Sequence, residues 1–318
     1  MTALVADVGG TKSQLRLISE SGTPIHEITV LNRDFPSFED LLGRFMQKQP
    51  AVRYGVIAVA GPVDHGKRCQ MTNLPWILDA DNLCRECGFH QVMLLNDLQA
   101  TAWGMTDPDI QHQLAILRGT GLNFKQPVVV ISPGTGLGEA CILPHPTGFV
   151  ISATEGGHKS VAPFNARSAE LVHQHWQQHD FPPSWENWFS GSGFADLYRA
   201  LYPELPVPDN ATLGREALAD TTSPAGQCMQ LFAEAIYAEA GNLVLQYLAW
   251  GGIIVAGGIP PKLEHFFQQP AAIDYVHKKN EYVDRLARVP VALCRLTEIP
   301  LAGAARFLQV NLQNPGVF

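Results

Sequence analysis

The residue types best suited to phosphate chemistry stand near the start of the chain, between two predicted strands. An apolar stretch reaches Asp7, and the next turn contributes, in order, Gly9, Gly10, Thr11 and Lys12. Polar and apolar residues then alternate, which predicts a second strand and therefore a glycine hairpin. Such a hairpin can present backbone N–H groups to phosphate oxygens, while a carboxylate holds magnesium and a hydroxyl donates a hydrogen bond. Taken alone, an ordinary hairpin with glycines at positive φ explains the motif equally well.

The same arrangement occurs a second time. The apolar stretch 128–131 leads into a turn with Gly134, Thr135, Gly136 and Gly138, and another apolar stretch follows. A Rossmann fingerprint or a Walker A loop requires a helix directly after its glycines, and neither copy predicts one. The repeat therefore favours a duplicated hairpin over those two motifs.

A third glycine turn, Gly257 and Gly258, follows the apolar stretch 253–256, and it would let a backbone approach a flat ligand closely. The three motifs lie roughly 100 residues or more apart, a length suited to one domain each. In this order they resemble the phosphate-1, phosphate-2 and adenosine motifs of the actin, hexokinase and heat-shock-chaperone ATPase superfamily. The resemblance implies an α/β, two-lobed, actin-like ATPase (ribonuclease H-like) fold with an ATP and sugar cleft between the lobes.

A second set of polar residues could bind a sugar and activate one of its hydroxyls. Asn96 and Asp97 end an apolar stretch, and Glu155, His158 and Glu186 occur later. A carboxylate at the carboxyl end of a strand lies where open α/β sheets bind ligands, and it can accept a hydroxyl proton. Carboxylate and amide oxygens can also accept hydrogen bonds from adjacent sugar hydroxyls. In simpler interpretations, Asn96 and Asp97 cap a helix and His158 is a polar turn residue.

The segments around these residues look like the sugar-binding signatures of bacterial glucokinase. The similarity covers essentially the whole chain and is carried by residues 94–102, 154–158 and 186–193, with support from 58–63, 71–76 and 217–220. It implies an ATP-dependent hexose kinase that phosphorylates glucose at the 6-hydroxyl, a reaction of glycolysis. Asp97 would be the catalytic base, and the sugar would be held by Asn96, Asp97, Glu155, His158 and Glu186.

The resemblance also assigns the cofactors, ATP and Mg²⁺. The nucleotide site would contain Asp7, Gly9, Gly10, Thr11, Lys12, Gly134, Thr135, Gly136, Gly138, Gly257 and Gly258, with Asp7 holding Mg²⁺ through water. We expect positive φ at Gly136, so that a β-carbon there weakens nucleotide binding more than sugar binding. Lys12 and Ser160 depart from the familiar pattern, in which asparagine and aspartate stand at these positions. No zinc is expected, because no cysteine cluster follows His158.

The chain has 318 residues, 46% of them hydrophobic, which suits two α/β lobes. We expect a small lobe over 1–108 joined by a C-terminal helix over 300–318, and a large lobe over 109–299. Helices are predicted over 37–49, 79–87 and 225–250. We expect core positions at the apolar residues that recur near helical spacing in the last of these, Leu231, Ile236, Leu243, Leu245 and Leu248. The segment 174–192 looks irregular apart from Glu186, with Trp176, Trp185 and Trp188 as packing residues.

Charge and cysteine content narrow the classes of partner. The net charge is −8 without basic runs, which argues against nucleic acid and anionic membranes as partners. The chain opens with a predicted strand and its six cysteines are scattered, so we expect a reducing cytoplasm, with Cys84 and Cys87 as free thiols. No apolar run approaches the roughly 20 residues that span a bilayer.

Rival functions remain open at this point. The same residues would serve a kinase for a different hexose, or a non-enzymatic sugar-sensing protein of the same fold. An ATPase without a small acceptor has no use for the sugar-binding set. Relatives are commonly homodimers, and the sequence leaves the oligomeric state undecided.

Overall fold

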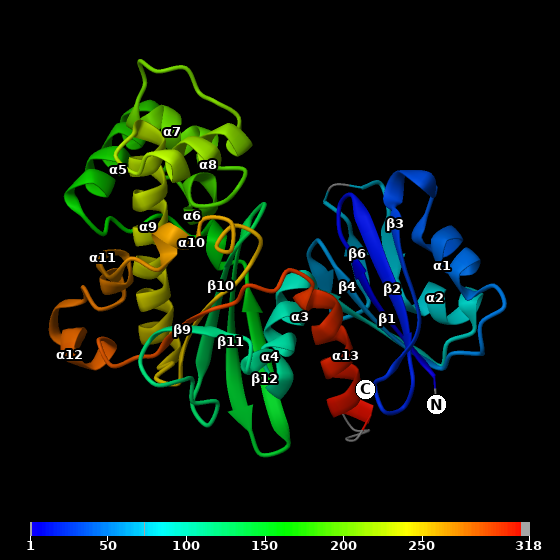
Figure 1. Ribbon diagram of the computed structural model, residues 1–318. Coiled ribbons are helices and arrows are strands. Elements are labelled where there is room, and N and C mark those ends of the chain that lie inside the picture. The colour runs from blue at the N-terminus through cyan, green and yellow to red at the C-terminus, as the bar shows by residue number, and fades with distance from the viewer. Residues whose placement is uncertain (1, 73, 313–318) are drawn as a thin grey trace. The chain divides into compact units, whose positions relative to one another are not determined.

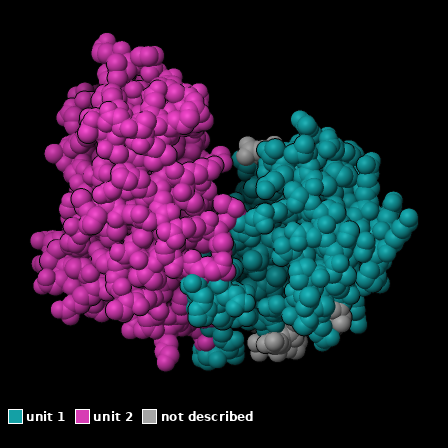
Figure 2. Space-filling model, in the orientation of Figure 1, with its two compact units in different colours: residues 1–112, 146–148, 298–318 teal, residues 113–145, 149–297 magenta. Residues whose placement is uncertain are grey.

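The computed structural model describes residues 2–72 and 74–312, so Asn73 and residues 313–318 of the predicted C-terminal helix lie outside the described residues. The chain divides into two compact units, coloured separately in Figure 2. The first is drawn from residues 1–112, 146–148 and 298–318, and the second consists of residues 113–145 and 149–297. The division expected from the sequence falls after residues 108 and 299, whereas the units separate after residues 112 and 297.

A five-stranded mixed sheet frames the first unit. Its order is β3-β2-β1-β4-β8, with β1 antiparallel to β2 and parallel to β4. A small antiparallel sheet of β5, β6 and β7 is inserted after β4. The strands are β1 (Ala3–Val8), β2 (Lys12–Ile18), β3 (Pro24–Leu31), β4 (Tyr54–Val59), β5 (Val63–Asp64), β6 (Arg68–Gln70), β7 (Ile77–Asp79) and β8 (Gln91–Asn96).

Burial and helix caps explain this arrangement. All residues of the central strand β1 except Asp7 are buried, whereas exposed and half-buried residues alternate along the edge strand β3. Helix α1 (Phe38–Met46) begins after Ser37 and α2 (Ala80–Cys87) after Asp79, and each of these side chains accepts a hydrogen bond from the backbone N–H three residues on. These caps satisfy N–H groups that a helix end leaves without an internal partner.

The end of the chain returns to the first unit. Helix α13 (Ile299–Leu312), red in Figure 1, lies beside α3 (Asp97–Gly104). A β-carbon on Gly303 would lie 1.7 Å from the carbonyl oxygen of Ala100, so the two helix backbones approach closely at this glycine. The rings of Trp103 and Phe307 pack edge to face with centroids 5.3 Å apart. The short segments η1 (Asn32–Asp34) and α4 (Pro108–Gln111) complete the described part of this unit.

The sheet of the second unit repeats the first, as the duplicated glycine motif predicted. Its order is β12-β11-β10-β13-β14-β9, and β10 is antiparallel to β11 and parallel to β13, as β1 is to β2 and β4. An additional antiparallel strand, β9, pairs with β14. The strands are β9 (Ala115–Arg118), β10 (Val128–Pro133), β11 (Leu137–His145), β12 (Gly148–Thr154), β13 (Gly252–Val255) and β14 (Val291–Leu293).

Helix α9 (Pro224–Tyr247), yellow in Figure 1, packs against β10 and forms much of the second core. Leu231, Ile236 and Leu243 are buried as predicted. Leu248 is 59% exposed, so its predicted core position is wrong. The reason is that the helix ends there: Leu248 is the cap residue and adopts the left-handed conformation, with φ 51°.

The segment 174–192 is more regular than predicted. Helix α5 (Ala166–Gln178) extends into it, because Asn165 and Ser168 form a reciprocal cap at its start. Trp185 and Trp188 of α6 (Trp185–Trp188) are buried as expected, whereas Trp176 is 54% exposed. The other helical segments are η2 (Gly156–His158), α7 (Phe194–Leu201), α8 (Asn210–Ala219), α10 (Glu264–Phe267), α11 (Pro270–Ile273), η3 (Asp274–Val276), η4 (Asn280–Tyr282) and α12 (Val283–Leu286).

Both units are therefore mixed α/β, as predicted. Cys84 and Cys87 are free thiols, and burial raises the pKa of both. Among the described residues, no helix is both long and apolar enough to cross a membrane.

Candidate active site

The first glycine loop connects β1 to β2 and is held by a buried asparagine. The Gly9 N–H donates to the Lys12 carbonyl at 3.0 Å. The Asn32 side-chain amide donates to the Gly9 carbonyl at 2.8 Å, and the Ser13 hydroxyl donates to Asn32 Oδ1 at 2.6 Å. The Asn32 N–H in turn donates to the Thr11 carbonyl at 2.9 Å. Asn32, which is 1% exposed, thus ties β3 to the loop.

Asn32 was not among the residues predicted from the sequence, since an asparagine after a strand usually indicates only a turn. We expect Asn32→Ala to weaken nucleotide binding, because the loop loses the partner of its Gly9 carbonyl. The loss of this buried pairing should cost about 1–3 kcal/mol of stability. Denaturant unfolding and the KM for ATP provide the measurements. In Asn32→Asp the acceptor for Ser13 remains but the donor to Gly9 is lost, so a wild-type ATP KM in both variants would contradict a loop-holding role.

Asp7 lies at the end of β1 in an acidic environment. The pKa of its carboxyl is raised to about 6, mainly by burial and next by the charge of Asp97, with a smaller increase from Glu298 and with Lys12 opposing. The negative charges of Asp97 and Glu298 disfavour ionisation of Asp7, and a bound divalent cation would offset this repulsion. The position of Asp7 therefore fits the predicted magnesium role. Lys12 lies near enough to interact with the charge of the Asp7 carboxylate.

Asn96 and Asp97 lie at the junction between β8 and α3 in the first unit. Asn96 Oδ1 accepts from the Leu98 N–H at 2.9 Å, and its amide donates to the Gly61 carbonyl at 3.1 Å. Asp97 Oδ1 accepts from the same N–H at 2.8 Å. The capping interpretation is thus correct for Asn96. The cap uses only the side-chain oxygen of Asn96, and its amide, which donates to the Gly61 carbonyl, carries a second hydrogen.

The second glycine loop connects β10 to β11 and is bound to the segment that follows α6. The Gly191 N–H donates to the Gly134 carbonyl at 2.7 Å, and the Ser192 N–H donates to the Thr135 carbonyl at 3.0 Å. The Leu137 N–H donates to Glu186 Oε2 at 2.8 Å. A predicted sugar residue therefore contacts a predicted phosphate loop directly.

Space, rather than conformation, explains the glycine at position 136. The expectation of positive φ is wrong, since the backbone of Gly136 lies outside that region. A β-carbon there would instead lie 2.4 Å from Glu186 Oε2. The Gly134 N–H is also occupied, by the Gly136 carbonyl at 2.8 Å. Gly138 is not in the loop: it lies in β11 and pairs with Ser132.

The third glycine turn follows β13. Gly257 has φ 91°, and a β-carbon there would lie 2.6 Å from the Pro133 carbonyl oxygen. The backbone that Gly257 approaches closely is therefore that of β10, in its own unit. At Gly258 a β-carbon would meet no atom within 4 Å. Of the two, Gly258 has the open surroundings that a ligand would need.

The predicted sugar residues of the second unit lie together. His158 Nε2 lies 3.9 Å from Glu155 Oε2 and 4.0 Å from Glu186 Oε1. The side chains of Glu155 and His158 are 74% and 62% exposed, and that of Glu186 is 29% exposed. Residues far apart in the sequence thus form one acceptor-rich patch, which could bind several hydroxyls of one ring.

Three further residues beneath this patch were not predicted from the sequence. Glu139 of β11 and Glu239 of α9 are 0% and 1% exposed, and Lys159 Nζ lies between them, 2.9 Å from Glu139 Oε2. Burial lowers the pKa of Lys159, but its interactions with the Glu239 and Glu139 carboxylates outweigh this effect, so the pKa is raised. No sequence spacing brings these positions together, and only the tertiary fold pairs them.

Glu139 should make the stability of the protein depend on pH. Burial and the charge of Glu239 raise the pKa of the Glu139 carboxyl from 4.5 to about 7, with Lys159 opposing. Between these values the native state binds a proton that the unfolded state does not, so stability falls as pH rises from about 4.5 to about 7. Of the cations near this cluster, Lys159 has a raised pKa, whereas burial lowers the pKa of Lys279 and the charge of Glu239 opposes that decrease. We expect Glu139→Gln to remove this decline, and denaturant unfolding of both proteins from pH 5 to pH 8 tests it. Parallel pH profiles would contradict the assignment.

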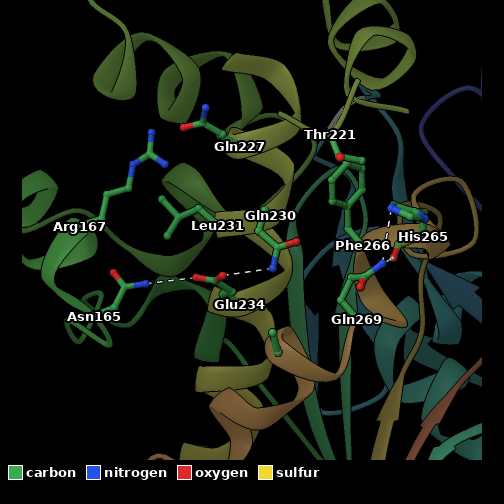
Figure 3. Close-up of a pocket in the computed structure, with 11 residues that line it drawn as sticks. Asn165, Arg167, Thr221, Gln227, Gln230, Leu231, Glu234, His265, Phe266 and Gln269 are labelled. Atoms are coloured by element: carbon green, nitrogen blue, oxygen red, sulfur yellow. Dashed lines mark hydrogen bonds between the residues drawn. The ribbon is translucent and has the colours of Figure 1, made fainter. Parts of the chain in front are cut away.

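A cavity of about 400 Å³ lies elsewhere in the second unit, between α9 and the segment near α10 (Figure 3). None of the predicted site residues lines it. Several of its polar side chains already have partners: Asn165 and Gln230 both donate to Glu234, at 3.2 and 3.1 Å. Such self-satisfied groups give no sign of a required ligand, so we do not place the chemistry there.

Comparison with known proteins agrees with these features. A protein-family model described as Glucokinase matches residues 4–311. The chain is 30% identical over 338 residues to a glucokinase of Nostoc sp., covering 96% of this chain and 98% of that protein. It is similar to the crystal structure of a glucokinase from an Antarctic psychrotroph, with a TM-score of 0.84, 27% identity and coverage of 96% and 98%. A ROK family glucokinase from Streptomyces griseus, solved with glucose and AMPPNP, shares the fold, with a TM-score of 0.64, 19% identity and coverage of 96% and 99%.

Proposed function

Because the chain belongs to the glucokinase family of ATP-dependent hexose kinases, we propose that it transfers the γ-phosphoryl group of ATP to the 6-hydroxyl of glucose, with Asp97 as the general base. The main support is the patch of Glu155, His158 and Glu186, which is contacted by the second glycine loop through the Leu137 N–H. An ATPase without a sugar acceptor has no need for this arrangement. The relative from Streptomyces griseus was solved with both glucose and a nucleotide analogue, which supports the same pair of substrates.

The proposed roles follow from the chemistry of each group. Asp97 accepts the proton of the 6-hydroxyl as that oxygen attacks phosphorus, and ADP leaves with the bridging oxygen. Asn96, Glu155, His158 and Glu186 bind the other hydroxyls and orient the ring. The Gly9 and Gly134 N–H groups are already bonded within their loops. The proposed phosphate donors are therefore the N–H groups of Gly10, Thr11, Thr135 and Gly136.

Magnesium is part of this proposal. When bound, it would neutralise phosphate charge, and Asp7 would hold it through water. The described residues contain no cluster of three or more His, Cys, Asp or Glu side chains arranged for a metal, so most ligands would be phosphate oxygens and water. We expect EDTA to abolish glucose-dependent ADP release and added Mg²⁺ to restore it. Full activity after exhaustive chelation would remove the metal from the mechanism.

A coupled ADP-release assay tests the function. The acceptors are glucose, mannose, fructose and N-acetylglucosamine, with buffer alone as the control. Glucose should give the highest kcat/KM and buffer almost no turnover. Preference for another hexose would correct the substrate only. Binding of glucose without ADP release would favour a sugar-sensing protein.

A further inference from the structure

The segment 154–160, which carries Glu155 and His158, packs closely against β11. A β-carbon on Gly156 would lie 1.7 Å from Glu139 Oε2, and one on Gly157 would lie 2.1 Å from the Leu137 carbonyl oxygen. The Thr154 hydroxyl donates to the Glu139 carbonyl at 3.2 Å, and the Gly156 N–H donates to Thr154 Oγ1 at 3.1 Å. Glu155 and His158 thus project from a backbone whose position is set by its contact with β11.

Lys159 lies in this segment and connects it both to the buried carboxylates and to the start of α6. Its ammonium group lies between the buried carboxylates of Glu139 and Glu239. Its carbonyl accepts from the Trp185 N–H at 2.9 Å, at the start of the helix that carries Glu186. The side chain therefore holds the segment to β11 and α9, while the backbone holds the helix of the third sugar residue.

The carboxylates depend on this lysine. Glu239 also accepts from the Asn242 amide at 2.7 Å, and Asn242 Oδ1 accepts from Lys279 at 2.7 Å. Glu139 has no such additional partner: within the described residues its oxygens accept no hydrogen bond, although Lys159 lies at ion-pair distance. Glu139 thus contributes mainly attraction for the lysine.

We propose that Lys159, held between Glu139 and Glu239, is a positioning residue that fixes Glu155, His158 and Glu186 for sugar binding. This inference rests on the proposed function for its substrate. Lys159 does not touch the sugar in this account. It acts through the segment 154–160 and through the start of α6.

The test compares three variants of the full chain. Lys159→Met should raise the glucose KM at least tenfold and change the ATP KM less than about twofold. Lys159→Arg keeps the charge and should recover most of the glucose affinity. The triple variant Glu139→Leu, Lys159→Met, Glu239→Leu removes the unpaired charges, so it should unfold near the wild-type temperature while its glucose KM stays high. A wild-type glucose KM in the triple variant would show a purely structural role and overturn the proposal.

Amide hydrogen exchange separates this proposal from the proposed function. In Lys159→Met, exchange should become faster in residues 154–160 and 184–187 and stay unchanged in β1 and β4. This readout needs neither glucose nor ATP. Unchanged exchange in both segments would overturn the positioning role even in an active kinase. Faster exchange in a chain that does not phosphorylate glucose would sustain the positioning role and refute the substrate assignment.

Discussion

Asp97→Asn is expected to lower kcat by about 10²–10⁴-fold and to leave the glucose dissociation constant within a few-fold of the wild-type value. The amide retains an oxygen that can accept the Leu98 N–H bond now made by Asp97 Oδ1. It cannot accept the proton of the attacking hydroxyl. Asn96 provides the principal cap of α3, so the helix start should persist. Steady-state kinetics and calorimetric titration with glucose measure the two effects separately.

Asp81→Asn is a matched control for this experiment. Asp81 also lies in the first turn of a helix, α2, and it is an exposed acid paired with Lys67. Its replacement removes the same charge from the same kind of position without touching the proposed site. The kcat of this variant should equal that of the wild type. Retention of most activity by Asp97→Asn would exclude Asp97 as the base.

Gly136→Ala is expected to weaken glucose binding by about 10–100-fold, which corresponds to the loss of about 1.5–3 kcal/mol from hydrogen bonds to a charged group. The new β-carbon would lie 2.4 Å from Glu186 Oε2. The end of a glutamate side chain can move, so the chain should still fold. The movement would break the bond from the Leu137 N–H and displace a proposed sugar ligand. This outcome reverses the prediction from sequence that a β-carbon at position 136 weakens nucleotide binding more than sugar binding.

Gly134→Ala is the control within the same loop. There the nearest atom to a β-carbon would be the Gly136 carbonyl oxygen at 4.0 Å, so Glu186 should stay in place. Both variants report on phosphate binding, but only Gly136→Ala should raise the glucose dissociation constant. Calorimetry with glucose alone, without nucleotide, provides the comparison. Equal glucose affinities in the two variants would contradict the displacement of Glu186.

Local patterns predicted the frame well because the relevant forces act between near neighbours. The duplicated hairpin, the helix start after Ser37 and the length of α9 all follow from alternation, caps and apolar spacing. Leu248 shows the limit of this approach. Its spacing fits the helix, but the helix ends at that residue, and tertiary contacts rather than periodicity decide its exposure.

Side-chain chemistry was predictable only where a motif marks it. Glu155, His158 and Glu186 were found by resemblance, and the structure brings both glutamates within about 4 Å of His158. Asn32 and Lys159 carry no such mark, since each acts through partners on elements distant in sequence. The reason for the glycine at position 136 also required the fold, because it depends on where Glu186 lies.

The ion network of Glu139, Lys159 and Glu239 has a consequence for mutational history and for engineering. Losing one member leaves a buried charge without its counterion, at a cost of about 3–5 kcal/mol, whereas exchanging all three for apolar residues is often nearly neutral. A single substitution that adds or removes one member of the network should therefore lower stability strongly. The effects of substitutions at the three positions should accordingly be non-additive. A loop graft that moves residues 154–160 into another scaffold would bring the lysine without its acids, and it should fail unless β11 and α9 contribute both carboxylates with it.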